Sequence, residues 1–349
     1  MKTKEFQSIL KKKKIDFALF YNVDYDKADA NMLYFSGYKG IGALVITRNR
    51  KFLIVPKMEI GRVKGIKRHV WDKNYRLFEF VKKKVKGKVI GIDKNVFTLN
   101  HYKELKKHFK NAKTADISKI CGKLRTIKAN KEIKIIRNAC KITDSILKKC
   151  FSNFKMFRKE TDVAAFLGNE TKKLGCEMAF NPVVASGKNA AVPHHVPENI
   201  KLKNGFCVID FGVKYKGYCS DETRTIYIGK PKEKEIRLYN FLLGIQKDAI
   251  NNARIGKKCH DLYNKVNKDL RKYKKYFTHG LGHGIGIDIH ELPNLTEKSK
   301  DILKRGMAFT IEPGIYFKNR LGIRIEDDIL LVEKGIEILT KAKKELITI

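Results

Sequence analysis

Two aspartates in the stretch FCVIDFGVKYKGYCSDETRTIYI, residues 206–228, are spaced so that their carboxylates can lie close together. Runs rich in Val, Ile, Phe and Tyr flank the turn-forming KYKG, which predicts a β-hairpin. If the turn is centred between Tyr215 and Lys216, Asp210 faces Asp221 directly. If it is centred one residue later, the two aspartates are diagonal neighbours on the same face. Both registers bring two carboxylates side by side.

Two like charges in such a pair destabilise the hairpin unless something compensates them. Opposed Cβ atoms lie about 5 Å apart, and at an effective dielectric near 20 the repulsion is roughly 3 kcal/mol. One carboxylate is protonated, or both point to solvent, or a divalent cation lies between them. The apolar residues around Asp210 and Asp221 argue against solvent.

The same pattern occurs a second time and favours the cation. LKNG leads through an apolar run to Asp210, and LKRG leads through an apolar run to Glu312. The second copy also turns back, into GIRIE ending at Glu326. We therefore expect two related halves that each contribute two inward carboxylates to a shared centre. Four carboxylates in one apolar cleft require metal charge, because an unpaired buried acid protonates.

Histidines gather beside the two predicted hairpins. A segment rich in Gly and Pro precedes the first hairpin and carries His194 and His195. Between the hairpins, THGLGHGIGIDIHELPN carries His279, His283 and His290. Its closely spaced glycines argue against a helix and permit close backbone approach to a ligand. We expect one imidazole to join the four carboxylates.

Composition bounds the class of protein. The chain has 349 residues, which suits two domains, and its hydrophobic fraction of 43% is that of a globular protein. It has no apolar run of about 18 residues and no signal-peptide pattern at the N-terminus, so we expect a cytoplasmic protein without membrane contact. Its seven cysteines are odd in number and lack a C-x-x-C, which predicts reduced core residues.

A formal net charge of +38 suggests nucleic-acid binding, but the distribution of charge argues against specific recognition. Lysines are spread along the whole chain, without a basic tail, an RNA-recognition signature or a zinc-finger spacing. We expect no specific nucleic-acid partner, and only weak non-specific binding at low salt.

The elements that position these residues fall into two groups. The first, residues 1–122, alternates helices and strands and indicates an α/β domain. Its predicted elements are a helix at 5–14, a strand at 16–21, a turn-rich aromatic segment at 31–40, a hairpin of 43–47 with 52–55, a helix at 75–85, a strand at 88–93 and a helix at 100–109. The second, residues 123–349, contains the candidate site and predicts helices at 130–153, 163–174 after an N-cap at Thr161, 233–253 and 261–274.

Taken in order, the motifs resemble those of the pita-bread metallopeptidases (family M24), specifically Xaa-Pro dipeptidases (prolidases) and Xaa-Pro aminopeptidases. The motifs are VIDFG with Asp210, SDETRT with Asp221, GLGHGIG with His283, IEPG with Glu312 and IRIED with Glu326; YFSGY and LRTIKANKEI match other family segments. The resemblance covers nearly the whole chain. It implies a creatinase-like α/β amino domain, residues 1–122, and an α+β pita-bread catalytic domain, residues 123–349, with an internal pseudo-two-fold repeat.

The resemblance also implies roles for single residues. Two divalent ions, Mn(II) or Co(II) with Fe(II) as a further option, would be held by Asp210, Asp221, His283, Glu312 and Glu326. A water bridging the ions would be the nucleophile and Glu312 its general base. His194 and His290 would steady the substrate and the oxyanion, Arg324 would fix a ligand carboxylate, and His279 and His195 would be bystanders.

The implied activity is hydrolysis of Xaa-Pro bonds in small peptides by a homodimer, with a Xaa-Pro dipeptidase as the first expectation. Two alternatives stay open: an aminopeptidase P acting on longer peptides, and a non-catalytic pita-bread binding module. Asn294 follows HELP where some prolidases carry Arg, which puts the restriction to dipeptides in question. Asp162 replaces a more usual Glu at a helix start. The five intact ligand positions argue against the binding module.

Overall fold

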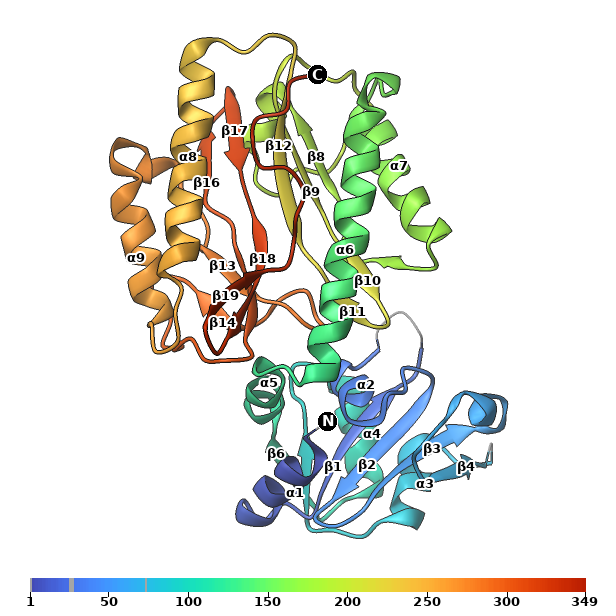
Figure 1. Ribbon diagram of the computed structural model, residues 1–349. Coiled ribbons are helices and arrows are strands. Elements are labelled where there is room, and N and C mark those ends of the chain that lie inside the picture. Colours follow the sequence, from blue (N-terminus) through green and yellow to red (C-terminus); the bar gives the residue numbers. More distant parts are fainter. Residues whose placement is uncertain (1, 25–27, 73) are drawn as a thin grey trace. The chain divides into compact units, whose positions relative to one another are not determined.

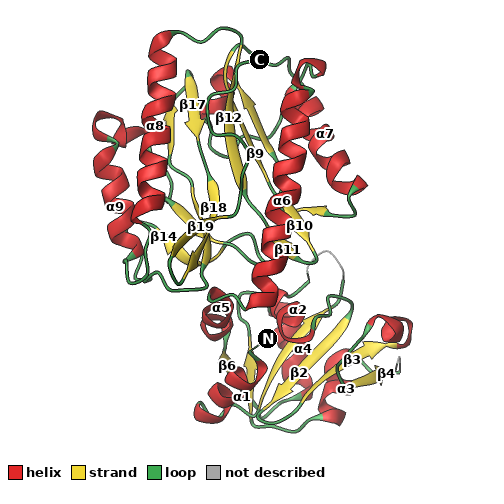
Figure 2. Cartoon of the chain, in the orientation of Figure 1, coloured by secondary structure: helices red, strands yellow, loops and turns green. Residues whose placement is uncertain are grey.

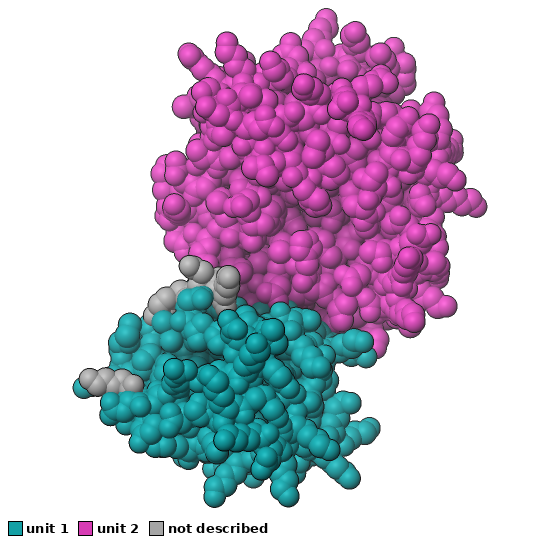
Figure 3. All heavy atoms as spheres, turned by 180° about the vertical axis from the view of Figure 1, so that it is seen from behind, with its two compact units in different colours: residues 1–125 teal, residues 126–349 magenta. Residues whose placement is uncertain are grey.

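The computed structural model describes residues 2–24, 28–72 and 74–349. The chain divides into two compact units, residues 1–125 and 126–349, coloured separately in Figure 3. The boundary predicted between residues 122 and 123 falls inside helix α5, Ser118–Thr126. Within the described ranges, no helix is both long and apolar enough to cross a membrane.

A mixed six-stranded sheet with helices forms the first unit (Figure 1). Its strand order is β4-β3-β2-β1-β5-β6, with β1 antiparallel to β2 and parallel to β5. The strands are β1 Phe17–Asn22, β2 Gly42–Thr47, β3 Lys51–Pro56, β4 Arg68–Trp71, β5 Val89–Ile92 and β6 Lys113–Asp116. The helices are α1 Thr3–Lys12, α2 Ala30–Ser36, η1 Lys57–Arg62, α3 Leu77–Lys84, α4 Leu99–His108 and α5. The predicted α/β character of this unit is confirmed.

The turn-rich segment predicted at 31–40 is wrong, because most of it forms helix α2. The side chain of Asp29 caps the helix by accepting a hydrogen bond from the backbone N–H of Asn31. Gly37, at φ +72°, ends it in the left-handed conformation. Its aromatic residues face the core, where Phe35 stacks on Phe6 with ring centroids 4.7 Å apart. Burial of the aromatic face outweighs the weak helix propensity of these residues.

The second unit repeats one arrangement of elements. Two helices precede a long acid-bearing hairpin, first α6, α7 and β9–β12, and then α8, α9 and β15–β18. In Figure 2 the strands lie between α6 and α7 on one side and α8 and α9 on the other, and each helix pair packs on its own hydrophobic cluster. The helices are α6 Asn130–Ser152, η2 Phe154–Met156, α7 Glu160–Lys173, η3 Gly187–Ala191, α8 Glu233–Asn252, α9 Cys259–Asp269 and η4 Arg271–Tyr276. The predicted internal repeat is confirmed.

Helix α7 begins earlier than predicted. Its first residue is Glu160 and its N-cap is Lys159, so the N-cap at Thr161 is wrong. The carboxylate of Asp162 accepts hydrogen bonds from the backbone N–H groups of Arg158 and Lys159, each at 2.9 Å. Asp162, at the third position of the helix, thus supplies the half of a capping box in which an acid reaches back to the backbone N–H of the N-cap residue.

The first acid-bearing hairpin adopts the second of the two predicted registers. Asp210 pairs with Thr223, and Tyr215 pairs with Tyr218. The turn is therefore Lys216 and Gly217, both at positive φ as a two-residue hairpin turn requires. Its strands are β9 Gly205–Phe211, β10 Val213–Tyr215, β11 Tyr218–Cys219 and β12 Glu222–Ile228, and β7 Glu177–Met178 and β8 Val183–Ser186 pair at its edges.

The second hairpin places two acids directly across from each other. Its strands are β15 Ala308–Ile311, β16 Gly314–Phe317, β17 Leu321–Arg324 and β18 Asp327–Val332, with β19 Gly335–Ile338 at the edge. Ile311 pairs with Asp327 and Gly314 with Arg324, and this single register sets Glu312 opposite Glu326. The histidine-rich stretch between the hairpins forms strands β13 Gly282–Gly284 and β14 Glu291–Leu295. This agrees with the expectation that its glycines disfavour a helix; the strands themselves were not predicted.

Candidate metal centre and active site

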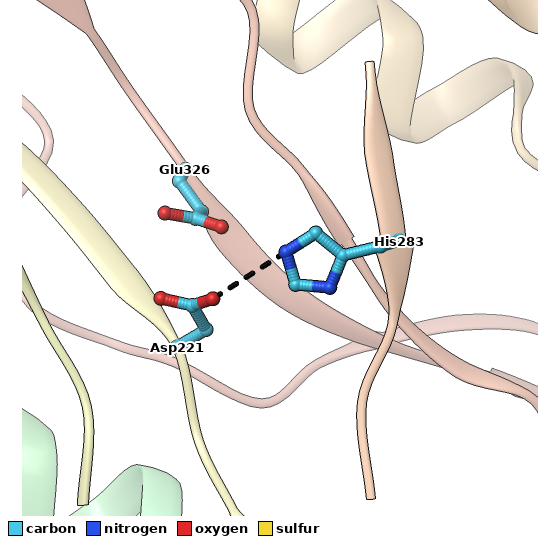
Figure 4. Close-up of side chains that lie close together, drawn as sticks. All are labelled: Asp221, His283 and Glu326. Carbon is cyan, nitrogen blue, oxygen red and sulfur yellow. Dashed lines mark ion pairs between the residues drawn. The ribbon is translucent and has the colours of Figure 1, made fainter. Parts of the chain in front are cut away.

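Three side chains from separate segments of the second unit converge on one point (Figure 4). Asp221 immediately precedes β12, His283 lies in β13 and Glu326 immediately precedes β18. One ligand atom of each lies within 4.8 Å of the other two, and His283 Nε2 is 3.6 Å from Asp221 Oδ2. This spacing is what a single cation held by two carboxylates and an imidazole requires.

The other two predicted ligands border the same point. Glu312 Oε1 lies 3.4 Å from His283 Nε2 and accepts a hydrogen bond from the Thr310 hydroxyl at 3.1 Å. Asp210 is held by Arg324, whose Nη2 donates to its Oδ2 at 2.7 Å. All five predicted ligands line a single cleft of about 510 Å³.

Several carboxylate oxygens in this cleft lack a hydrogen-bond partner. Among the described residues, nothing donates to Asp210 Oδ1, Asp221 Oδ1 or Glu326 Oε1, although all three atoms are buried. A buried anionic oxygen without a donor costs several kcal/mol unless a cation compensates it. The three oxygens and the His283 nitrogen therefore fit a divalent metal ion as their missing partner.

The pKa values of the clustered carboxyl groups also indicate negative charge that no neighbouring group compensates. Burial raises the pKa of Asp221 and of Glu326 well above the usual carboxyl range, and neighbouring carboxylates raise both further. Burial also lowers the pKa of His283, so its imidazole is neutral at pH 7 and has a lone pair to donate. Carboxylate oxygens with one imidazole form a hard donor set that suits oxygen-preferring divalent ions.

Arg324 lies beside the cluster of carboxylates and makes more hydrogen bonds than its position in the sequence suggested. Besides Asp210, its guanidinium donates to the Tyr316 hydroxyl at 2.8 Å and to the Pro193 carbonyl at 3.1 Å. Its Nε donates to the Thr223 hydroxyl at 3.1 Å. Burial opposes this charge, but Tyr316 and Asp210 outweigh it and hold the pKa of Arg324 well above its usual value.

The four other histidines that the sequence places beside the hairpins occupy different positions. His194 and His290 are exposed and line the cleft, and the ring centroids of His290 and His283 lie 4.3 Å apart. His279 also lines the cleft, and its Nε2 lies 2.9 Å from the Tyr316 hydroxyl. His195 is buried against Glu160, with Nε2 2.8 Å from a carboxylate oxygen. Both histidines expected to be bystanders, His279 and His195, are among the residues that line the cleft.

Several polar residues at this site were not predicted from the sequence. Thr223 donates to Glu326 Oε2 at 2.6 Å, Tyr316 joins Arg324 to His279, and Thr310 holds Glu312. A signal existed for two of them, because Thr223 and Thr310 lie two residues from a predicted ligand and so share its strand face. Nothing in the sequence distinguishes Tyr316 from an aromatic residue of the core.

Two family models account for most of the chain. The model of metallopeptidase family M24 matches residues 134–333, and that of the creatinase/prolidase N-terminal domain matches residues 2–127. These matches confirm the predicted fold class.

Similar proteins and structures extend over almost the full length. A Xaa-Pro dipeptidase of Pyrococcus horikoshii is 34% identical, with 99% of this chain and 98% of the relative covered. The structure of a Xaa-Pro dipeptidase from Bacillus anthracis superposes with a TM-score of 0.91 at 32% identity, covering 100% of this chain and 99% of the other. The structure of an X-Pro aminopeptidase from Thermotoga maritima gives a TM-score of 0.90 at 30% identity, covering 96% and 98%.

Proposed function

The chain belongs to metallopeptidase family M24, and from this premise we propose that it is a Xaa-Pro dipeptidase that removes the residue before proline. One observation carries the proposal: Asp221, His283 and Glu326 converge in a cleft where buried carboxylate oxygens lack partners. The same cleft of about 510 Å³ is large enough for a small peptide.

We assign the metal ligands to Asp210, Asp221, His283, Glu312 and Glu326. When bound, divalent ions supply Lewis acidity to a water molecule and to the scissile carbonyl. The choice of two ions, Mn(II) or Co(II) with Fe(II) as a further option, is part of this proposal and is supported by the oxygen-rich donor set.

Glu312 is the proposed general base. Thr310 holds one of its carboxylate oxygens, and His279 Nδ1 lies 4.0 Å from the other. Among the described residues no hydrogen bond to this second oxygen is found, so it can take the proton of the attacking water and return it to the departing proline nitrogen. Water thus adds across the Xaa-Pro bond, with its hydroxyl on the carbonyl carbon and its proton on nitrogen.

His194 and His290 are the proposed donors to the substrate. Both line the cleft, and burial lowers the pKa of His290, which keeps that ring neutral with one N–H at pH 7. A preorganised N–H aimed at the scissile carbonyl oxygen stabilises the charge that develops during attack. Arg324 positions the Asp210 carboxylate and touches no substrate in this scheme.

The test uses metal-stripped protein resupplied with Mn(II) or Co(II). Proline release from Met-Pro and Ala-Pro is compared with hydrolysis of the tripeptide Ala-Pro-Ala, and Met-Ala serves as the control without proline. Hydrolysis of both dipeptides but not of Met-Ala supports the Xaa-Pro dipeptidase. If no peptide is hydrolysed with either metal, the proposal is wrong.

One feature of the cleft supports aminopeptidase activity on longer peptides as a second candidate. Asn294 lines the cleft, and Arg324 is the single lysine or arginine among the described lining residues, although 75 of the 349 residues are lysine or arginine. Arg324 is already bound to Asp210 and Tyr316. The described lining residues therefore offer no uncommitted lysine or arginine to bind a dipeptide's C-terminal carboxylate, and we propose that the cleft accepts peptides that continue past proline. Hydrolysis of Ala-Pro-Ala would favour this candidate.

The cellular setting and assembly are also proposals. All seven cysteines are buried with free thiols, which confirms their predicted role as core residues and supports a reducing compartment such as the cytoplasm. The homodimer implied by the family resemblance is tested by light scattering on the purified protein, where a monomer mass would contradict it.

A further inference from the structure

One buried carboxylate outside the metal cluster holds the loop that carries His194. Glu160, the first residue of α7, has a fully buried side chain. Its Oε1 accepts hydrogen bonds from the Ser186 N–H at 2.8 Å, the Ser186 hydroxyl at 2.9 Å and the Asn189 amide at 3.2 Å. Its Oε2 accepts from His195 Nε2 at 2.8 Å and from the Glu198 N–H at 3.2 Å. A single carboxylate thus binds the loop at both ends and in the middle.

The opposite side of the loop is fastened to the metal cluster. The carbonyl of Pro193 accepts a hydrogen bond from Arg324 Nη1 at 3.1 Å, and Arg324 also holds Asp210. His194 therefore lies between two residues that are held in place. Arg324 binds the carbonyl of Pro193, and Glu160 binds the side chain of His195. Its own side chain is exposed and lines the cleft.

The charge on Glu160 suits this role. Burial opposes ionisation, but the hydrogen bonds from Ser186, His195 and Glu198 outweigh it and lower the pKa of Glu160 below the usual value. An ionised carboxylate accepts from all of these donors at once, whereas a neutral amide cannot. His195 must carry its proton on Nε2 to donate to this carboxylate.

We propose that Glu160 and His195 are positioning residues that fix the backbone on both sides of His194, so that its imidazole is held in place for the peptide. This inference rests on the proposed function, in which His194 contacts the substrate. It assigns a catalytic consequence to a buried pair 35 residues apart in the chain, neither of which belongs to the metal cluster.

Hydrogen exchange tests, without any substrate, whether the hydrogen bonds of Glu160 hold the loop of residues 186–198 in place; we call this set of bonds the clamp. In Glu160→Gln, at least one of the donors loses its acceptor, and we expect peptides from residues 187–198 to exchange at least about tenfold faster than in the wild type. Glu170→Gln is the matched control, because Glu170 lies on the same helix and bridges Lys149 and Lys173 instead. Unchanged exchange of the loop in Glu160→Gln would overturn the clamp. His195→Ala removes one of the donors to Glu160 and serves if Glu160→Gln does not fold.

A double-mutant cycle tests the catalytic consequence. We expect Glu160→Gln to lower kcat on Ala-Pro by roughly ten- to a hundredfold at unchanged metal content, because a small displacement of a reacting group is costly. In a His194→Ala background the same change should cost less than about twofold. An equal fold-loss of kcat in both backgrounds would overturn the proposal, because a general structural defect lowers kcat by the same factor whether or not His194 is present. If the wild type hydrolyses no Xaa-Pro peptide, the proposed function fails and hydrogen exchange alone decides the clamp.

Discussion

Arg324 Nη2 lies 2.7 Å from Oδ2 of Asp210, a residue 114 positions earlier in the chain. The contact joins the two acid-bearing hairpins, since Asp210 is in β9 of the first and Arg324 is in β17 of the second. The arginine side chain is 3% exposed. It therefore orients a proposed metal ligand while leaving the other Asp210 oxygen for the metal.

Replacing this arginine should weaken metal binding. Arg324→Lys keeps the charge but cannot reach Asp210, Tyr316 and Pro193 together, because lysine lacks the planar fork. We expect the affinity for Mn(II), measured by titration calorimetry, to fall roughly ten- to a hundredfold. Arg137→Lys is the control, because Arg137 donates two hydrogen bonds to Glu337 and is not among the residues that line the cleft. Equal Mn(II) affinities for all three proteins would contradict the role of Arg324.

Replacing the proposed general base should remove activity and preserve the fold. For Glu312→Gln with Mn(II) supplied, we expect kcat on Ala-Pro to fall by about 10²- to 10⁴-fold, because the amide cannot accept the water proton. Circular dichroism checks the fold and metal analysis checks the occupancy. Glu333→Gln, at a surface pair with Arg305, should keep full activity. Near-normal turnover by a metal-loaded Glu312→Gln protein would refute the assignment.

Metal ions should stabilise the fold through the three converging ligands. At a free Mn(II) concentration of 100 times Kd, binding adds about 2.7 kcal/mol to the free energy of unfolding. We expect Mn(II) to raise the melting temperature of the wild type, and EDTA to reverse the rise. Asp221→Asn should abolish this response, whereas Asp248→Asn, at a surface pair with Lys265, should retain it. An undiminished shift in Asp221→Asn would show that Mn(II) binds elsewhere.

The first unit should lose stability as pH rises. Burial raises the pKa of Asp29 to about 7, so between pH 4 and 7 the folded chain keeps a proton that the unfolded chain releases. Stability from this group is complete below pH 4 and is lost as pH rises to 7, by up to about 4 kcal/mol. Asp29→Asn preserves helix capping and cannot ionise. Its urea-unfolding free energy should vary less with pH over this range than that of the wild type; identical pH profiles would argue against the shift.

Local pattern predicted many of the elements and failed where a distant partner intervened. The β2–β3 hairpin and the long helices followed from turn residues and periodicity. Helix α2 was not predicted, because its aromatic residues are stabilised mainly by burial in the core of the first unit, which the local sequence pattern does not specify. The start of α7 was misplaced for a similar reason, since Glu160 at its first position is bound by Ser186 at the end of β8 and by His195 in the loop that follows.

The sequence alone determined which carboxylates share a face, because side chains alternate with a period of two along a strand and a hairpin joins neighbours in the chain. It left two registers open for Asp210 and Asp221, and the backbone at Lys216 and Gly217 decided between them. Only the tertiary structure joined Thr223 to Glu326. Contacts of this kind depend on how separately formed elements pack, and no local spacing encodes that packing.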